Sequence, residues 1–187
     1  MKKKNNKPLL VLIAGKSGSG KDYVTNIIID HLKQYMLDES EYKRLRKVKS
    51  RTTRPRRYPE EDTHVFIDFT TASKEIGSAL AYTHFHGNYY YATVDDTDKA
   101  MFYIIDKDGI EYFKTTEWYD RYNVLSVEIT CPALLRLKRM IKRDGFFKAI
   151  SRFINDIKAF RGLKTDIKMS YKQAKRYLIF EILDKLS

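Results

Sequence analysis

The hydrophobic residues near the start of the chain follow two patterns in turn. Residues 8–14, PLLVLIA, form a continuous apolar run, which is typical of a strand buried on both faces of a parallel sheet. After a glycine-rich stretch, Val24, Ile27, Ile28 and Leu32 recur at the spacing of one helix face. The pattern therefore predicts a strand, a glycine loop and a helix in that order.

Further apolar runs predict strands in the middle of the chain. Residues 100–106, AMFYIID, and residues 123–130, NVLSVEIT, each have the character of a buried strand. Two aromatic and β-branched runs, at residues 63–69 and 81–94, predict a small sheet or hairpin region. The charged, aperiodic residues 38–62 predict a charged helix end followed by an extended loop.

Helical spacing returns after the last of these strands. Pro132 suits the first turn of a helix in which Leu134, Met140 and Ile141 form an apolar side. Residues 146–160 form a second amphipathic stretch. Strands that alternate with helices predict a single α/β domain built around a mainly parallel sheet.

The balance of charge narrows the range of partners. The chain carries 36 Lys and Arg against 24 Asp and Glu, a net charge of +12, which favours nucleotides, nucleic acid or an anionic membrane. No stretch approaches the roughly 20 apolar residues of a membrane span, and the N-terminal sequence lacks the cleavage site of a signal peptide. The lone Cys131 fits a reducing compartment, so we expect a cytoplasmic protein that does not engage a membrane.

Gly15, Gly20 and Lys21 satisfy the spacing G-x-x-x-x-G-K of a phosphate-binding loop, and they lie between a predicted strand and a predicted helix, as that motif requires. Glycines allow successive backbone N–H groups to converge on an anion at the positive end of the helix. Lys21 would reach the terminal phosphates. ATP would contact the whole stretch: Gly15, Lys16, Ser17, Gly18, Ser19, Gly20, Lys21 and Asp22.

Asp22 departs from this pattern, because a Ser or Thr normally follows the lysine. A hydroxyl at this position ligates Mg²⁺, and a carboxylate could bind the same ion directly or through water. The stretch SGKD also resembles the phosphate loops of some phage deoxynucleoside monophosphate kinases and of animal phosphomevalonate kinase. Mg²⁺ is therefore the expected cofactor, with Asp22 as a candidate ligand.

The segment SRTTRPRRYPEED, residues 50–62, concentrates four arginines before an acidic end. The stretch FHGNYYYAT, residues 85–93, is similar to F-x-G-N-x-Y-G-[ST] of the guanylate kinase family, and RMIKRDG followed by Arg152 is similar to the arginines of that family's lid. Six residues of the arginine segment reproduce the family spacing S-x-T-T-R-x-x-R-x-x-E: Ser50, Thr52, Thr53, Arg54, Arg57 and Glu60. The chain therefore resembles a guanylate kinase over most of residues 9–160.

This resemblance implies an enzyme that transfers the γ-phosphoryl group of ATP to a purine nucleoside monophosphate, most directly GMP or dGMP, with Mg²⁺. It also implies a P-loop nucleoside-triphosphate hydrolase fold, with a parallel sheet flanked by helices, a small subdomain that binds the monophosphate and a helical lid. The core would comprise residues 8–46 and 97–135 and the C-terminal helix, the subdomain residues 47–96, and the lid about 136–156.

The resemblance also assigns roles to single residues. Arg54 and Arg57 would clamp the acceptor phosphate with help from Tyr90, and His64 stands where the family has another phosphate-binding tyrosine. Ser50 would contact the base, whereas Arg51 and Arg56 would be solvated. Three lid residues would close over the phosphates: Arg139, Arg143 and Arg152. Arginine suits these roles because its planar fork binds phosphate oxygens bidentately.

Several positions depart from the family pattern. The guanine-recognising glutamate and a small hydroxyl residue of the family fall at Ala81 and Ala92, which leaves the base specificity open. His84 and His86 lie nearby and could supply substitute contacts. Asp106 matches the second of two family aspartates and would hold Mg²⁺ through water or touch the acceptor. The residues from Leu163 onward do not show the family's late strand.

Three functions remain open at this stage. The first is a nucleoside monophosphate kinase, either guanine-specific or of altered base specificity. The second is a non-catalytic guanylate-kinase-like domain that binds a protein or peptide, which the alanines favour and the retained Lys21, Arg54 and Arg57 oppose. The third, a P-loop protein acting on RNA or DNA, explains the charge but not the ordered motifs, so nucleic acid is not the expected partner. The sequence does not indicate an oligomeric state.

Overall fold

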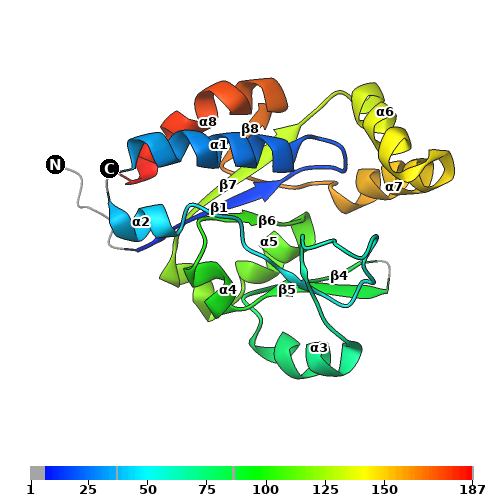
Figure 1. The fold of residues 1–187 in the computed structure, drawn as a ribbon, viewed down its shortest axis with the longest axis horizontal. Coiled ribbons are helices and arrows are strands. Elements are labelled where there is room, and N and C mark those ends of the chain that lie inside the picture. Colours follow the sequence, from blue (N-terminus) through cyan, green and yellow to red (C-terminus); the bar gives the residue numbers. More distant parts are fainter. Residues whose placement is uncertain (1–6, 37, 86, 187) are drawn as a thin grey trace.

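The computed structural model describes residues 7–36, 38–85 and 87–186 (Figure 1). At its centre lies a four-stranded sheet with the strand order β6-β1-β7-β8. The strands are β1 (Leu9–Ala14), β6 (Phe102–Ile104), β7 (Asn123–Thr130) and β8 (Ile167–Ser170), and every neighbouring pair is parallel. The predicted parallel sheet is confirmed.

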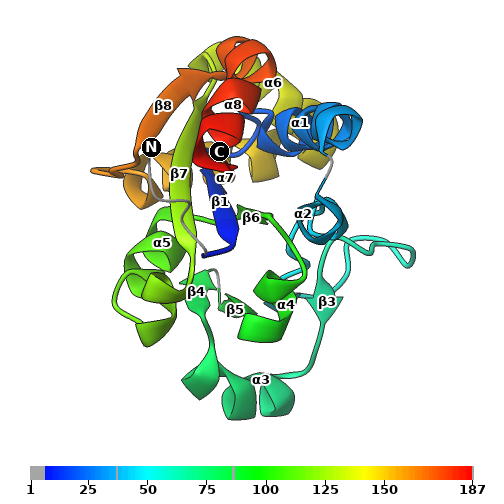
Figure 2. The ribbon, with the colours of Figure 1, turned by 90° about the vertical axis from the view of Figure 1, so that its left-hand side faces the viewer.

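The apolar run of β1 is buried on both faces of this sheet. Its odd-numbered residues pack against helices α1 (Lys21–Tyr35) and α8 (Tyr171–Leu186), which cover one face. Its even-numbered residues pack against α5 (Lys107–Phe113) on the other face. Figure 2 shows α1 and α8 above the strands and α5 below them. An α/β architecture with helices on both faces of the sheet results.

A second, smaller sheet lies on the α5 side, with the strand order β3-β2-β5-β4. Its strands are β2 (Arg51–Thr52), β3 (Val65–Phe66), β4 (Ala81–Phe85) and β5 (Asn88–Ala92). β4 and β5 form the predicted hairpin. The run at 63–69 is a strand only at Val65 and Phe66, because Asp68 caps helix α3 (Phe69–Glu75) by accepting a hydrogen bond from the Thr71 amide.

The two predicted amphipathic stretches form the helices α6 (Ala133–Asp144) and α7 (Phe146–Ala159). Gly145, with a φ of 80°, separates them and lets the chain reverse, so the two helices pack against each other at one end of the molecule (Figure 1). This helix pair stands beside the loop that joins β1 to α1.

The segment after Leu163 does contain a strand, β8, which the sequence analysis did not predict. It pairs with β7 from Val127 to Thr130. Asp166 fixes its start, because its carboxylate accepts hydrogen bonds from the Ser126 amide and hydroxyl at 2.8 and 2.7 Å. Four residues of mixed polarity at a sheet edge give too weak a pattern to be recognised from the sequence.

Short elements connect these parts. Helices α2 (Glu39–Lys43) and α4 (Val94–Asp98) flank the smaller sheet in sequence, and two short 3₁₀ helices occupy residues Ile76–Ser78 and Glu117–Arg121. Within the described ranges, every helix is too short or too polar to cross a bilayer.

Candidate functional site

The loop between β1 and α1 requires glycine at several positions. Gly18 and Gly20 have φ values of 74° and 91°, in the left-handed region that favours glycine. A Cβ atom on Gly15 would lie 2.5 Å from the Ile129 carbonyl oxygen, so a side chain has no room there. The glycines of the motif are therefore required by the backbone path itself.

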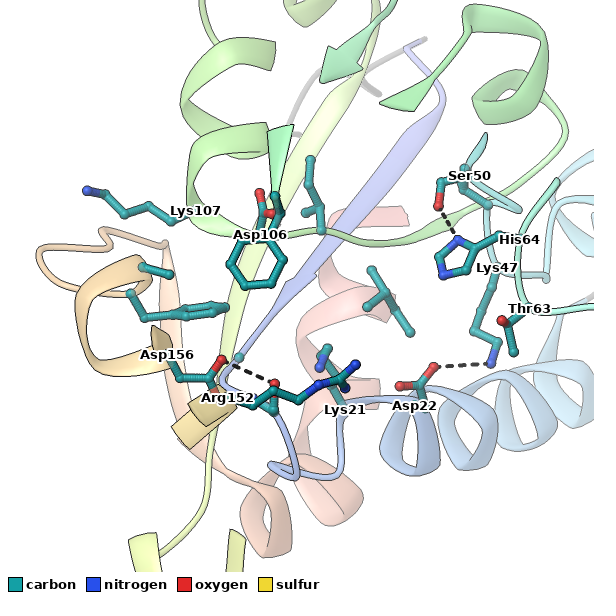
Figure 3. A pocket seen from close by; sticks show the side chains of 18 of the residues that line it. Lys21, Asp22, Lys47, Ser50, Thr63, His64, Asp106, Lys107, Arg152 and Asp156 are labelled. Carbon is teal, nitrogen blue, oxygen red and sulfur yellow. Dashed lines mark hydrogen bonds and ion pairs between the residues drawn. The ribbon is translucent and has the colours of Figure 1, made fainter. Parts of the chain in front are cut away.

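Lys21 is the first residue of α1 and borders a cavity of about 630 Å³. Burial lowers the pKa of its ammonium group, and the nearby carboxylates of Asp22 and Asp156 partly oppose this effect. Figure 3 shows Lys21, Asp22 and Arg152 close together at one end of this cavity, with Ser50 and His64 on another side and Asp106 above. The cavity thus joins the loop to the smaller sheet and to the helix pair.

Three arginines from distant parts of the chain line this cavity: Arg57, Arg143 and Arg152. The pKa of Arg57 is lowered by burial and by the positive charges of Arg54 and Arg152. Asp144 holds the other two arginines side by side, at 2.8 Å from Arg143 and 3.4 Å from Arg152. Aspartates line the same cavity, so positive charge dominates only where these arginines gather, and a gathering of this kind favours an anion.

Arg54 does not reach the cavity with Arg57, although the two were predicted to clamp the acceptor phosphate together. Its two terminal nitrogens donate to the Glu61 carboxylate at 3.1 and 2.8 Å, and Arg54 does not line the cavity. The same carboxylate accepts from the Arg57 amide at 2.7 Å and from the Thr63 hydroxyl at 2.9 Å. The hydrogen bonds from Arg54 are the main cause that lowers the pKa of Glu61 to about 2. Arg54 therefore braces the segment that carries Arg57.

Ser50 and His64 lie together on the side of the cavity formed by the smaller sheet (Figure 3). The Ser50 hydroxyl lies 2.9 Å from Nδ1 of His64, and the ring of Tyr90 meets the His64 ring edge-on at a centroid distance of 5.9 Å. Burial lowers the pKa of His64. Ser50 and His64 therefore reach the cavity, whereas Tyr90 lies behind His64 and does not line it.

Both candidate metal ligands line the cavity, but their surroundings differ. The Asp22 side chain is 69% exposed and lies 3.7 Å from the Lys47 ammonium group. Asp106 caps α5 by accepting from the Gly109 amide at 2.8 Å, and it accepts from the Thr83 hydroxyl at 2.7 Å. Burial raises the pKa of Asp106. In the described part of the chain, no three His, Cys, Asp or Glu side chains gather as a metal cluster.

The two alanines at the family's base-contact positions lie in the core. Ala81 and Ala92 are both fully buried and pack in the cluster that contains Leu10 and Leu12 of β1. His84 is exposed and packs against Tyr89, while His86 lies outside the described residues. Neither alanine nor His84 lines the cavity.

Arg139 borders a second, smaller hollow of about 430 Å³, which is also lined by Gly18 and Gly20 of the loop. Its guanidinium group donates to the Gly18 carbonyl at 3.0 Å and lies 4.9 Å from the centre of the Tyr171 ring. Tyr23 and Arg143 border the same hollow. Of the predicted lid arginines, Arg143 and Arg152 thus reach the main cavity, and Arg139 reaches its neighbour.

Three residues with close contacts to the site were missed or assigned otherwise by the sequence analysis: Glu61, Arg136 and Asp156. Glu61 rather than Glu60 binds the arginine segment, since Glu60 is exposed. The Asp156 carboxylate accepts a hydrogen bond from the Ser17 amide at 2.7 Å. The available signal was the place of Asp156 in the predicted amphipathic stretch 146–160. An acid on the buried face of a helix requires a partner.

No protein-family model and no curated protein sequence matches this chain. Among solved structures, it is similar to guanylate kinase from Anaplasma phagocytophilum, with a TM-score of 0.63, 15% identity, and coverage of 98% of this chain and 89% of that one. It is also similar to the protein APE1195, with a TM-score of 0.51, 11% identity, and coverage of 99% and 100%. The chain therefore shares the P-loop α/β fold of that guanylate kinase structure.

Proposed function

We propose that the protein transfers the γ-phosphoryl group of ATP to a purine nucleoside monophosphate, with GMP and dGMP as the first candidates. The observation that carries the proposal is the convergence of Lys21, Arg57, Arg143 and Arg152 on one cavity beside a glycine-rich loop. Phosphoryl transfer requires two anionic groups held in line and stabilisation of the transferring charge, and fixed cations supply both.

The donor triphosphate would lie along the loop, with Lys21 at its terminal phosphates. The adjoining hollow suits a planar base, because Tyr23, Tyr171 and the Arg139 guanidinium group offer flat surfaces at its border. Arg143 borders both spaces and would therefore contact the phosphates between base and acceptor.

The residues around the loop fit a Mg²⁺ ion. Mg²⁺ is usually held by one or two carboxylates together with substrate phosphates, and Asp22 offers a largely exposed carboxylate at the cavity. Asp106 would be the secondary ligand, because its Oδ1 atom already accepts two hydrogen bonds. Bound there, the ion would neutralise part of the phosphate charge.

The acceptor phosphate would meet Arg57, whose position depends on Glu61 and through it on Arg54. Ser50 and His64 would face the nucleoside. Because burial disfavours the charged imidazole, His64 offers a neutral ring whose second nitrogen can donate or accept. A lone Cys131 is consistent with a cytoplasmic place of action.

The acceptor base is proposed more broadly than the acceptor phosphate. A carboxylate that accepts two hydrogen bonds from the guanine edge is worth about 1–3 kcal/mol by analogy with base readout in DNA, and Ala81 cannot supply it. We therefore include relaxed or altered base specificity. The buried alanines also favour a second candidate, a non-catalytic guanylate-kinase-like domain that binds a protein or peptide.

An assay of ADP release from ATP and Mg²⁺, with a panel of ribo- and deoxynucleoside monophosphates, separates these functions. A kinase gives stimulation by at least one acceptor, which Arg57→Ala removes. Arg121→Ala is the matched control, since Arg121 is a half-exposed arginine paired with Asp98 away from the cavity. A flat panel, with no difference between the two variants, would contradict the kinase and leave the binding domain.

A further inference from the structure

Ser17 in the phosphate loop is held on both sides of its backbone by residues of the helix pair. Its amide and hydroxyl donate to the two carboxylate oxygens of Asp156, at 2.7 and 3.1 Å. Its carbonyl accepts a hydrogen bond from Nε of Arg136 at 2.9 Å. Every polar group of Ser17 therefore has a partner in α6 or α7.

The two partners of Ser17 also bind each other. Arg136 on α6 donates to Asp156 on α7 at 2.9 Å, and both residues are only 5% exposed. The Arg136 guanidinium group also lies over the Phe153 ring at 5.1 Å. Buried charges are expensive unless they are paired and hydrogen-bonded, and this pair meets both conditions through Ser17.

The following residue of the loop is fixed in the same way. A Cβ atom on Gly18 would lie 2.9 Å from the Arg136 carbonyl oxygen, so α6 touches the loop backbone directly. Arg139 binds the Gly18 carbonyl at 3.0 Å. In a trans peptide the N–H points opposite to the carbonyl, so binding of the Ser17 carbonyl by Arg136 turns the Gly18 amide away from α6.

We propose that Arg136 and Asp156 are positioning residues that set the loop in its anion-binding shape and link the helix pair to donor affinity. The proposal rests on the proposed function only in taking ATP as the ligand of the loop. Its physical basis is preorganisation, because a loop already held in the binding conformation loses less entropy when phosphate arrives.

The negative charge of Asp156 acts against phosphate binding. Asp156 lines the main cavity, and an unpaired carboxylate there would repel phosphate. Arg136 compensates this charge at 2.9 Å, so the pair is close to neutral toward a ligand. Preorganisation therefore outweighs repulsion, and loss of the pair weakens ATP binding.

The decisive variant is the double substitution Arg136→Met with Asp156→Leu. Replacing a buried ion pair by apolar residues of similar volume is often neutral for folding, whereas removing one partner is not. Lys168→Met with Glu128→Leu is the matched control, since it removes an ion pair between β7 and β8. Three quantities are measured for each: Tm, amide hydrogen exchange of residues 15–20 in the ligand-free protein, and the Kd for ATP and for the acceptor by calorimetry.

We expect the double variant to fold with a moderately lower Tm, because the polar groups of Ser17 lose their protein partners. We also expect it to exchange faster across residues 15–20 and to bind ATP about 10- to 100-fold more weakly, with the acceptor Kd unchanged. Unchanged exchange would overturn the proposal, and so would tighter ATP binding, which would mean that Asp156 competes with phosphate. If the wild-type protein does not bind ATP, the proposed function fails, while the exchange comparison still decides the positioning role. Should the double variant not fold, Arg136→Lys tests the positioning role instead. A lysine ammonium lacks the planar fork with which Arg136 binds the Ser17 carbonyl and Asp156 at once.

Discussion

Glu61 should be worth more to the stability of the protein than its position in a charged loop implies. Its carboxylate is 1% exposed and accepts hydrogen bonds from Arg54, Thr63 and the Arg57 amide. The pKa of Glu61 falls from an ordinary 4.5 to about 2. At 1.36 kcal/mol per unit, this difference corresponds to about 3 kcal/mol of folding free energy at neutral pH.

The pH dependence has a definite sign. A carboxyl group whose pKa is depressed in the folded state stabilises the fold above its unfolded pKa, and the stabilisation is lost as the pH falls. For Glu61 the contribution should be nearly complete at pH 7, largely retained at pH 4, and about halved near pH 3. Urea unfolding of wild type and Glu61→Gln at these three pH values measures it.

Glu60→Gln is the matched control, because Glu60 is the exposed neighbour that the family spacing selects. Its effect should stay within about 0.5 kcal/mol, as for most surface substitutions. If the two variants lose similar amounts of stability, or if the loss from Glu61→Gln is independent of pH, the assignment of Glu61 as the counterion of the arginine segment is wrong.

Three further predictions concern the phosphate loop. Lys21→Ala should abolish ADP release while Tm changes little, because burial already penalises the ammonium group. Lys33→Ala, on the exposed side of α1, is the control. Retained turnover in Lys21→Ala would refute a phosphate-binding role for Lys21. Gly18→Ala should destabilise the protein and weaken ATP binding. The left-handed φ at this position costs about 1–2 kcal/mol for a non-glycine residue, and the added Cβ would meet Arg136. An unaltered Kd and Tm would count against the loop geometry. Asp22→Asn should raise the Mg²⁺ concentration needed for half-maximal turnover. Asp30→Asn, on the same helix, should leave it unchanged. If the two variants give identical Mg²⁺ titrations, Asp22 is excluded as a ligand.

The parallel sheet and the glycine-rich turn between β1 and α1 could be predicted because their signals are local. The run at residues 8–14 is continuous, and the spacing of Gly15, Gly20 and Lys21 has one structural context in which it makes sense. The β4–β5 hairpin was predicted for the same reason. The edge strand β8 was missed, because its pairing with β7 is a tertiary fact without a strong local pattern.

Partners of charged side chains were less predictable. Arg51 was expected to be solvated, yet it binds Glu75 and Asp96, both at 3.0 Å, across the smaller sheet. Charged groups in adjacent sequence positions can face opposite sides of a strand, so composition alone cannot assign their partners. The roles of Glu61 and Asp156 likewise depend on contacts that only the fold creates.

The burial of Ala81 and Ala92 also bears on how base recognition could change in such a protein. Each methyl group contributes to the same core as Leu10 and Leu12 of the central strand. Introducing a glutamate at position 81 would place an ionisable group in that core before it could meet a base, at a cost of several kcal/mol. A carboxylate at position 81 is therefore coupled to folding, and introducing one would require compensating changes in the central core.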